Sequence, residues 1–209
     1  MNKKKLKFTK NKNILVTGGS GLLARHIVKS LIRNNHKVIS LDKKKNYYKY
    51  SKLKFKNHQI IFGNFQSKKL ICNIIKKYNI NVIFHLGAST QVLNALTNPE
   101  NTYKNNIMGT INILEAIRLL NPKIILIYAS SDKAYGEKNI NNYKEKDKLH
   151  SIFPYDVSKS ASDLICQSYS KTYSLSVGIL RCTNLYGPGD FNLKRIIPET
   201  IIKSIKKKN

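Results

Sequence analysis

Two short stretches of this sequence carry side chains that could do proton chemistry. The segment Ser-Ser-Asp-Lys at 130–133 comes directly after an apolar run, 124–129, which is typical of a buried strand. Tyr155 and Lys159 follow on a segment with helical periodicity, and their spacing places both side chains on one helix face. The sequence therefore offers a hydroxyl, a carboxylate, a phenol and two amines to one site, provided that the fold brings the strand end and the helix together.

Strands and helices alternate along the chain, with β-branched and aliphatic runs for strands and apolar residues at helical spacing for helices. The predicted strands are 13–17, 37–41, 60–62, 82–86, 124–129 and 176–180; the predicted helices are the segment after Ala24, 70–78, 105–120, 155–173 and the segment from about 196; the predicted loops include 43–57 and 137–153. This alternation predicts an α/β fold with a doubly wound parallel sheet. In such sheets, ligands bind outside the carboxyl ends of the strands, where the Ser-Ser-Asp-Lys stretch lies.

A glycine-rich loop joins the first predicted strand to the first predicted helix. Gly18, Gly21 and Ala24 follow the spacing G-x-x-G-x-x-A. The glycines permit a tight turn and close approach to a pyrophosphate, and the small third residue lets the helix pack on the strand. The N-terminus of the helix that follows favours negative charge. The position between a strand and a helix indicates a dinucleotide-binding loop.

Asp42 ends the second predicted strand, at the distance past the glycine loop where a carboxylate accepts hydrogen bonds from an adenosine ribose. Such an acid favours NAD over NADP, because it would repel a 2′-phosphate. The alternative is a solvated acid before the lysine run 43–45. After the fourth predicted strand, Gly87 and Ala88 would let a cofactor lie against the backbone, whereas His85 is expected to be packed in the core.

The composition is strongly basic, with a formal net charge of +27 over 209 residues. One interpretation is nucleic-acid binding through phosphate contacts. We expect no specific nucleic-acid partner, because only five of the 38 basic residues are arginine and the lysines are scattered. Such a surface would still attract an anionic small substrate.

Neither a membrane segment nor a disulfide framework is expected. The apolar runs stay well below the ~18 residues of a membrane span, and no signal-peptide stretch follows the lysine-rich start. Cys72, Cys166 and Cys182 are far apart, which predicts free thiols in a reducing compartment rather than a zinc site. We therefore expect no metal and a cytoplasmic location.

Several segments resemble one family, the extended short-chain dehydrogenases/reductases that act as nucleotide-sugar epimerases and dehydratases. They are TGGSGLLA at 17–24, FHLGAS at 84–89, NIMGTINILEA at 106–116, PYDVSK at 154–159 and RCTNLYGPGD at 181–190. The last two, together with SSDKAYG at 130–136, look most similar to the CDP-glucose 4,6-dehydratase group. The resemblance implies a Rossmann fold, NAD as cofactor and a nucleotide-sugar substrate.

The resemblance also implies further contacts. Asn64 stands where relatives usually have an Asp near the adenine, and Asn can still make hydrogen bonds there. Asn106 corresponds to a helix asparagine that supports the site through backbone bonds or water, and Asn184 corresponds to the residue that contacts the substrate diphosphate. The predicted cofactor contacts are Gly18, Gly21, Leu22, Leu23, Asp42, Asn64, Phe65, Leu86, Gly87, Ala88, Asn106, Tyr155 and Lys159.

For the reaction, the resemblance implies a redox step at the sugar C4. Tyr155 would take the proton of the 4-hydroxyl as hydride leaves for NAD, Ser131 would hydrogen-bond the same oxygen, and Lys159 would hold the nicotinamide ribose. The Lys159 ammonium and the positive nicotinamide ring would favour phenolate, so we expect the pKa of Tyr155 to be lowered from ~10 toward neutrality. Tyr135 and Gly136 are expected to be structural.

Asp132 and Lys133 separate elimination from epimerisation. In dehydratases of the family these positions act as acid and base, removing the C5 proton and protonating the departing C6 hydroxyl before hydride returns to C6. This requires burial to raise the pKa of Asp132 and desolvation beside Lys159 to lower that of Lys133. A 4-epimerase needs only Ser131, Tyr155 and Lys159, and the Asp-Lys pair could also be a loop ion pair. We expect a dehydratase, since an adjacent acid and base are what elimination needs.

The resemblance implies two parts, an NAD-binding domain over 1–180 and the start of a truncated substrate-binding lobe over 181–209, because relatives continue further. A non-catalytic remnant that binds NAD or pairs with another chain is therefore a second hypothesis. Relatives commonly dimerise through two helices, here 100–120 and 155–173, so a homodimer is expected.

Overall fold

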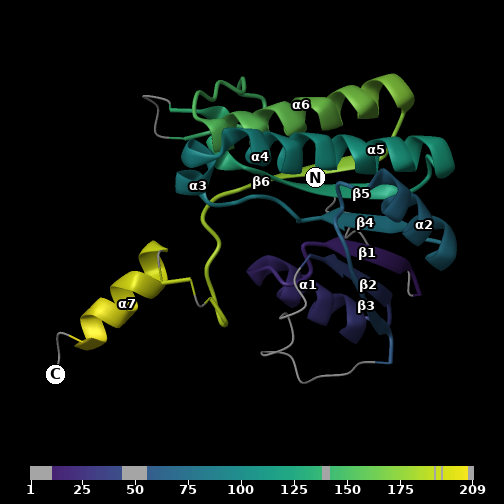
Figure 1. Ribbon diagram of the computed structural model, residues 1–209, viewed down its shortest axis with the longest axis horizontal. Helices are drawn as coiled ribbons and strands as arrows, with labels where there is room; N and C mark the ends of the chain where they lie inside the picture. Colours follow the sequence, from purple (N-terminus) through teal and green to yellow (C-terminus); the bar gives the residue numbers. More distant parts are fainter. Residues whose placement is uncertain (1–10, 44–55, 138–141, 191, 194, 207–209) are drawn as a thin grey trace, which may run out of the picture.

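The computed structural model describes residues 11–43, 56–137, 142–190, 192, 193 and 195–206. Its strands form a six-stranded sheet in the order β3-β2-β1-β4-β5-β6, and every pair is parallel (Figure 1). The strands are β1 (Asn13–Thr17), β2 (Lys37–Asp42), β3 (His58–Phe62), β4 (Val82–His85), β5 (Ile125–Ser131) and β6 (Val177–Cys182). The predicted doubly wound fold is confirmed. The chain direction across the sheet reverses between β1 and β4, which makes their carboxyl ends the crevice for a ligand.

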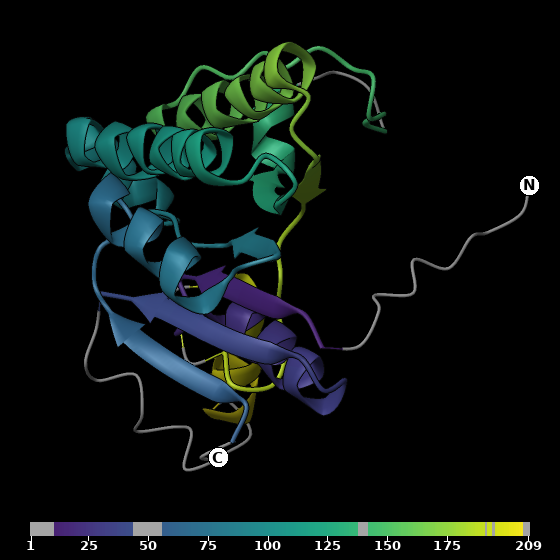
Figure 2. The ribbon, with the colours of Figure 1, turned by 90° about the vertical axis from the view of Figure 1, so that its right-hand side faces the viewer.

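Helices cover both faces of the sheet (Figure 2). The main ones are α1 (Leu22–Arg33), α2 (Lys68–Tyr78), α5 (Gly109–Leu120) and α6 (Pro154–Tyr173). On one face, α1 packs on Ile14 and Val16 of β1. On the other face, α2, α5 and α6 share a core with Leu15. Successive residues of a strand point to opposite faces, so β1 serves both cores and its three central residues, 14–16, are all apolar.

Local sequence sets the ends of the helices. The helix α2 begins after Ser67, whose hydroxyl accepts a hydrogen bond from the Leu70 amide, and it ends at Asn79 in the left-handed conformation. The helix α6 begins with Pro154, a favoured first residue, and ends before Ser174, which is also left-handed. The predicted tyrosine and lysine of the site therefore lie in the first two turns of α6.

The segment predicted as one helix over 105–120 consists of several pieces. The helix α4 (Pro99–Tyr103) begins earlier, because the Asn98 side chain caps it. A π-helical turn, η2 (Lys104–Met108), joins it to α5. The short helix α3 (Val92–Thr97), which the apolar pattern did not predict, precedes both.

The strand β5 is longer than predicted and includes both serines of the polar stretch. Ser130 and Ser131 pair with Arg181 and Cys182 of β6. The chain then enters a short 3-10 helix, η3 (Asp132–Tyr135). The polar stretch is therefore half strand and half helical turn, which turns its acid and its lysine away from the line of the strand.

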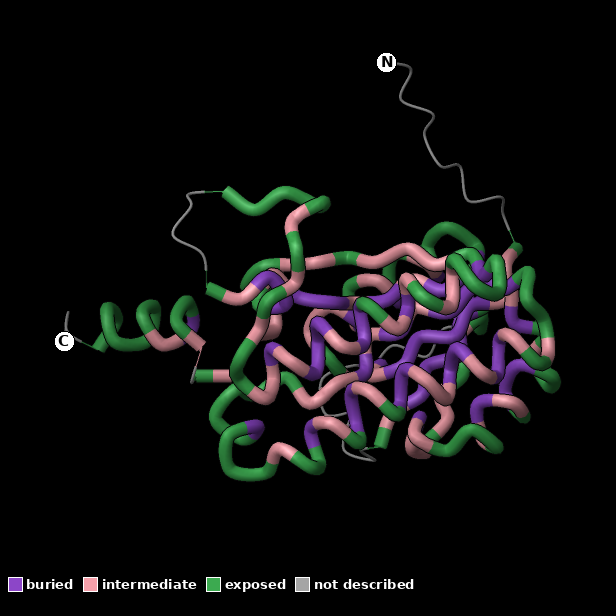
Figure 3. The backbone as a smooth tube through the Cα atoms, turned by 90° about the horizontal axis from the view of Figure 1, so that it is seen from above, coloured by how far each residue is buried: buried purple, intermediate pink, exposed green. Residues whose placement is uncertain are grey.

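The segment after β6 leads to α7 (Ile196–Lys206), which lies apart from the layers of the sheet (Figure 1). Buried residues concentrate along the strands and the inward helix faces, whereas α7 is mostly exposed (Figure 3). All the isoleucines of α7 are exposed, and Pro198 is its buried residue. The division into a domain over 1–180 and a lobe over 181–209 stays a prediction.

Some predicted segments lie wholly or partly outside the described residues. These are most of the loop 43–57, the part 138–141 of the loop 137–153, and the lysines that end the chain. None of the described helices is long and apolar enough to span a bilayer. The cysteines are free, as predicted.

Candidate active site

A cavity of about 610 Å³ opens where β1, β2, β4, β5 and β6 end. Its volume lies within the ~300–1,000 Å³ of small-molecule sites. The predicted residues that it brings together are Gly18, Gly21, Leu22, Leu23, Asp42, Phe65, Leu86, Gly87, Ala88, Ser131, Asp132, Lys133, Tyr155, Lys159 and Asn184. Of the predicted residues within the described ranges, Asn64 and Asn106 do not line it. The strand-end chemistry and the glycine loop therefore share one space.

The glycine loop forms its tight turn from backbone contacts. Gly18 has a φ of +68° and donates its amide to the Leu41 carbonyl at 2.9 Å. A Cβ at Gly18 would lie 2.7 Å from the Cα of Gly87, so a side chain would collide with the neighbouring strand end. Gly21 then caps α1 with extended backbone, and its amide bonds the Gly18 carbonyl at 2.9 Å. The absence of side chains lets the loop pass between the ends of β2 and β4.

Asp42 is fixed to this loop. Its Oδ2 accepts a hydrogen bond from the Ser20 amide at 2.7 Å. The neighbouring Lys43 donates to the Asn105 side chain at 2.9 Å and lies 5.6 Å from the centroid of the Phe65 ring. Burial lowers the pKa of Lys43, with the Asp42 charge acting against that shift. Sequence reasoning missed Lys43, because nothing distinguishes it within its lysine run.

His85 is a core residue, as predicted. Its Nδ1 lies 2.7 Å from the Thr17 hydroxyl and its Nε2 lies 3.2 Å from the Thr110 hydroxyl. Because Thr110 gives its proton to the Asn106 carbonyl, it accepts from His85, which places the histidine proton on Nε2. Burial, followed by the Lys159 charge, lowers the pKa of His85 to about 3. The neutral ring therefore ties together the elements beneath the cavity.

Asn64 forms a turn before α2. Its Oδ1 accepts from the Gln66 amide at 3.0 Å, and its Nδ2 donates to the Gln66 side chain at 2.8 Å. Both ends of its amide are thus occupied within the turn, and the predicted adenine contact finds no support in this geometry. The neighbouring Phe65 is buried, lines the cavity and meets His85 edge-on.

The π-helical turn η2 buries two consecutive asparagines, Asn105 and Asn106. Asn106 accepts from the Ser89 amide at 2.7 Å and donates to the Ser89 carbonyl at 3.1 Å and to the Ser158 hydroxyl at 2.8 Å. It thereby joins the segment after β4 to the residue just before Lys159. Its geometry is that of a supporting residue. A π turn, which often marks functional sites, was not visible in the periodicity.

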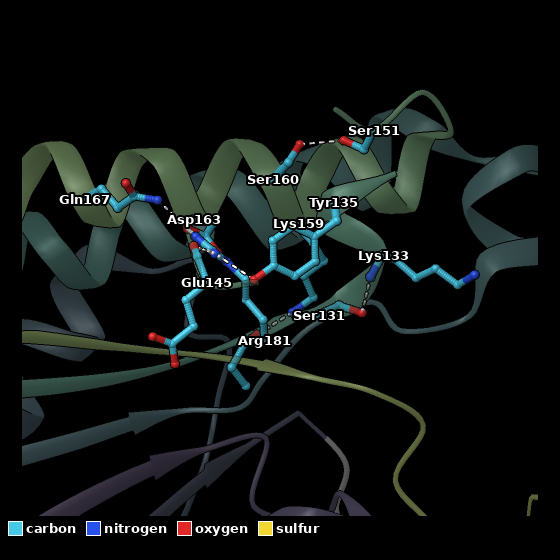
Figure 4. A network of polar contacts seen from close by, with 11 residues as sticks. Ser131, Lys133, Tyr135, Glu145, Ser151, Lys159, Ser160, Asp163, Gln167 and Arg181 are labelled. Carbon is cyan, nitrogen blue, oxygen red and sulfur yellow. Dashed lines mark hydrogen bonds and ion pairs between the residues drawn. The ribbon is translucent and has the colours of Figure 1, made fainter. Parts of the chain in front are cut away.

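Ser131 organises the turn that follows β5. Its hydroxyl donates to the Asp132 carboxylate at 3.0 Å and accepts from the Lys133 amide at 3.2 Å. Asp132 is half-buried, but Lys133 is exposed and its side chain points away from the polar network (Figure 4). The desolvation predicted for Lys133 beside a bound nicotinamide is therefore not present in the chain without a ligand, because η3 directs the lysine outward.

Tyr155 is half-buried beside this turn. Burial raises the pKa of its phenol above 10, and the hydrogen bond with Ser131 opposes that rise. The Asp156 and Asp132 charges add to the rise, whereas Arg195 lowers the pKa. The predicted lowering of this pKa is wrong for the chain without a bound ligand, because desolvation outweighs the nearby cations.

Lys159 lies deep in the site. Its side chain donates to the Ala129 carbonyl at 2.8 Å and lies 5.3 Å from the centroid of the Tyr128 ring. Burial lowers its pKa to about 8, so the ammonium stays mostly charged at neutral pH. The amine is held at the strand end by the backbone, which leaves its remaining protons for a ligand.

The segment after β6 brings a cation that sequence reasoning missed. Arg195 lines the cavity with Asn184, and it donates to the Leu185 carbonyl and the Asp190 carboxylate, both at 3.3 Å. Arg25 of α1 donates to the Gly189 carbonyl at 2.8 Å and thus fixes this segment beside the glycine-loop helix. The only signal in the sequence was the loop motif itself, which does not indicate where the next arginine will fold.

The cofactor end of the cavity fits a dinucleotide. The backbone at Gly18 and Gly87 is in mutual contact, and added side chains would fill this space. At Gly21 a Cβ would meet only the Gly18 carbonyl, so the start of α1 is open on its other sides. A carboxylate, Asp42, lies at the position that binds ribose hydroxyls.

Comparisons with known proteins agree with this geometry. Residues 14–209 match the model of the NAD dependent epimerase/dehydratase family. The chain belongs to this family. A trifunctional UDP-glucose 4,6-dehydratase/UDP-4-keto-6-deoxy-D-glucose 3,5-epimerase/UDP-4-keto-L-rhamnose-reductase of Arabidopsis thaliana is 32% identical over 95% of this chain and 31% of its own length. A putative UDP-glucose 4-epimerase of Methanocaldococcus jannaschii is 34% identical over 83% of this chain and 56% of its own length.

A solved relative shares the fold. The dTDP-glucose 4,6-dehydratase of Bacillus anthracis, in complex with NAD, is 29% identical and superposes with a TM-score of 0.81. The match covers 94% of this chain and 62% of the solved one. The chain thus spans less than two thirds of each of these relatives.

Proposed function

We propose that this chain carries the cofactor site and the acid–base centre of an NAD-dependent nucleotide-sugar 4,6-dehydratase. The observation that carries the proposal is the turn Ser131–Lys133, which lines the same cavity as Tyr155 and Lys159. An epimerase needs the serine, the tyrosine and the second lysine, but has no use for the added acid and amine. Membership of the family and the dehydratases among the relatives support this choice.

In this proposal NAD lies along the glycine loop, with its adenosine ribose on Asp42 and its nicotinamide ribose on Lys159. When bound, it supplies the hydride acceptor for C4 of the sugar and the donor that later reduces C6. The Lys159 ammonium, with a pKa of about 8, carries the charge that suits a ribose hydroxyl contact at neutral pH.

Tyr155 takes the proton from the sugar 4-hydroxyl. Its raised pKa means that the phenol keeps its own proton in the free chain. Formation of the reactive complex must therefore release that proton, and a positive ligand group beside the phenol favours the release. The Ser131 hydroxyl donates to Asp132 in the chain without ligand, and in the complex it turns this proton to the same sugar oxygen.

Asp132 and Lys133 perform the elimination. Once C4 is a ketone, the C5 proton is acidic; Lys133 in its neutral form removes it, and Asp132, which must first take up a proton, protonates the departing C6 hydroxyl. A charged lysine cannot accept a proton, so its exposed amine must be covered before it acts. A sugar bound across η3, and protein beyond the described residues, would provide that cover. Because Lys133 points outward in the chain without ligand, the substrate complex must cover its amine before the lysine can act as a base.

The finer identity of the substrate rests on fewer residues. Lys133 in place of the glutamate of many dehydratases favours CDP-glucose, whereas the relatives above act on UDP- and dTDP-sugars. We further infer a homodimer through α4, α5 and α6, where Leu119 and Leu164 are exposed, and a cytoplasmic location consistent with free thiols.

The test is turnover by the full chain with NAD and each of CDP-, UDP- and dTDP-glucose. A dehydratase forms a 4-keto-6-deoxy sugar, which absorbs in base. Formation of the 4-epimer instead would establish the epimerase alternative. NAD binding without any product, with activity returning when a C-terminal lobe of a relative is added, would establish a cofactor-binding part that needs a second segment.

The variant Lys133→Ala tests the acid–base assignment. We expect oxidation at C4, seen as absorbance of reduced cofactor, with elimination at least ~100-fold slower. Lys123→Ala is the matched control, because Lys123 is equally exposed but precedes the other end of β5. An unchanged dehydration rate in Lys133→Ala would remove this lysine from the mechanism.

A further inference from the structure

Arg181 forms a buried ion pair behind the reaction centre (Figure 4). It lies near the end of β6 and its side chain is 15% exposed, whereas that of Asp163 on α6 is fully buried. Nε donates to Oδ2 at 2.8 Å and Nη2 donates to Oδ1 at 3.0 Å. This is the bidentate arrangement that arginine forms with a carboxylate, and it fixes the guanidinium plane.

The remaining nitrogen of Arg181 reaches two other segments. Nη1 donates to the Tyr135 hydroxyl at 2.9 Å and to the Glu145 carbonyl at 2.7 Å. The Tyr135 ring stacks on Tyr143 with centroids 4.9 Å apart, and the Tyr143 hydroxyl donates to the Gly136 carbonyl at 2.9 Å. One guanidinium therefore joins α6, the end of η3 and the loop that follows it.

The positions of these partners show which two parts of the proposed active site the network connects. Tyr135 is the last residue of η3, and Asp132 is the first. Asp163 lies one helical turn after Lys159 on the same face of α6. Arg181 thus connects the element that carries the acid and the base of elimination to the helix that carries the redox groups.

The charges of this pair suit a fixed connection between α6 and η3. We call this connection, made by Arg181 with Asp163 and Tyr135, the brace. Burial would raise the pKa of Asp163, but hydrogen bonds from Arg181 and Gln167 outweigh burial and bring this pKa below its usual value. Hydrogen bonding to Asp163 raises the pKa of Arg181. Both groups stay ionised across the neutral range, so the brace keeps its geometry where proton transfer takes place.

We propose that Arg181 is a positioning residue for elimination, which holds Asp132 and Lys133 at their working distance from Tyr155 and Lys159. The inference rests on the proposed dehydratase function for its kinetic consequence. Its geometric part, the coupling of η3 to α6 through one guanidinium, can be tested on the chain without turnover.

The kinetic test uses Arg181→Lys, which keeps the charge but cannot hold both Asp163 and Tyr135. We expect NAD affinity and oxidation at C4 to stay near their original values, while elimination falls ~100-fold through misplacement of the acid and base. Reduced cofactor then accumulates during turnover, which absorbance reports directly. Tyr135→Phe removes the hydrogen bond from Arg181 to η3 and keeps Arg181 on Asp163, so it should give the same pattern with a smaller fall.

The matched control is Gln167→Ala. Gln167 donates to the same Asp163 carboxylate at 2.7 Å, from the side away from η3. Its loss weakens the ion pair while leaving the link from Arg181 to Tyr135 in place. We expect no accumulation of reduced cofactor in this variant.

Hydrogen exchange tests the brace independently of activity. The Lys133 and Gly136 amides are bonded within η3, to the Ser131 hydroxyl and the Lys133 carbonyl. Arg181→Lys and Tyr135→Phe should speed exchange at both amides and leave the Gly18 amide unchanged.

Unchanged exchange at both amides overturns the brace, whatever the activity. Faster exchange in a chain that shows no turnover keeps the brace and counts against the dehydratase function. Equal losses of NAD binding, oxidation and elimination would overturn the positioning role and leave a stability contact. If Arg181→Lys fails to fold, Tyr135→Phe decides.

Discussion

The two halves of the cavity are built in different ways. The cofactor half is built around the backbone of the glycine loop, with the Asp42 carboxylate beside it: Gly18 and Gly87 touch each other, and the loop is tied to Leu41 by its amides. The reaction half is made of side chains on a strand end, a helix and a 3-10 turn, and it includes the exposed Lys133. In our proposal the described chain supplies the first half, whereas the second depends on what covers it. We therefore expect cofactor binding and turnover to be separable in this protein.

This difference in construction also determines how each half of the cavity depends on pH. Backbone amides do not titrate, so the glycine loop keeps its form across a wide pH range. In the reaction half, burial raises the pKa of Tyr155 and lowers that of Lys159 to about 8. Substitutions in the two halves should consequently have different signatures.

Tyr155→Phe separates the halves most strongly. In the proposed mechanism Tyr155 is the base for the sugar hydroxyl, so its removal should lower the rate of oxidation at C4 by ~10²–10⁴-fold. NAD affinity should remain close to that of the wild type, because the glycine loop and Asp42 are untouched. Single-turnover absorbance of reduced cofactor measures the first effect and calorimetry the second. A large loss of NAD affinity would show that the halves are not independent.

Gly18→Ala breaks the cofactor half. A left-handed φ of +68° costs an alanine ~1–3 kcal/mol, and the added Cβ would lie 2.7 Å from the Gly87 backbone. We expect a lower free energy of unfolding by urea and loss of the stabilisation that NAD gives. Gly178→Ala is the control, because its Cβ would meet only the flexible end of Ile127. Equal stability of the two variants would contradict the close approach.

Burial of His85 in the core makes a smaller, pH-dependent contribution to the stability of the fold. Its folded pKa of about 3 lies below the unfolded value of 6.5, so the unfolded chain takes up the proton first. Stability that is present above pH 6.5 is lost as the pH falls toward 3, by about 1.4 kcal/mol per pH unit. In urea unfolding between pH 7 and 5.5, His85→Gln should remove this part of the slope, whereas the exposed control His150→Gln should keep it. Equal slopes in all three proteins would show that His85 is not buried neutral.

The sequence predicted the sheet well, because each buried strand is a local apolar run and parallel strands are apolar on both faces. Prediction from the sequence failed where a helix cap or a π-helical turn overrides the helical periodicity. The Asn98 cap started α4 early, and the π turn placed Asn105 and Asn106 on the inside together. Neither is visible as a helical period.

For the site, prediction succeeded where the chemistry lies in one motif and failed where it depends on distant contacts. Lys43 meets Asn105, and Arg181 meets Asp163, only after folding. The rise of the Tyr155 pKa in the chain without a ligand was missed for a related reason. The sequence shows which charges are near, but the extent of burial is a property of the packed structure.

A calorimetric titration of the full chain with NAD and NADP tests most directly whether the cofactor half works alone. We predict that the wild type and Tyr155→Phe bind NAD with the same affinity, that NADP binds more weakly to both, and that Asp42→Asn narrows the difference between the cofactors. Absence of NAD binding, or tighter binding of NADP, would contradict a cofactor half that is complete within the chain and selective through Asp42.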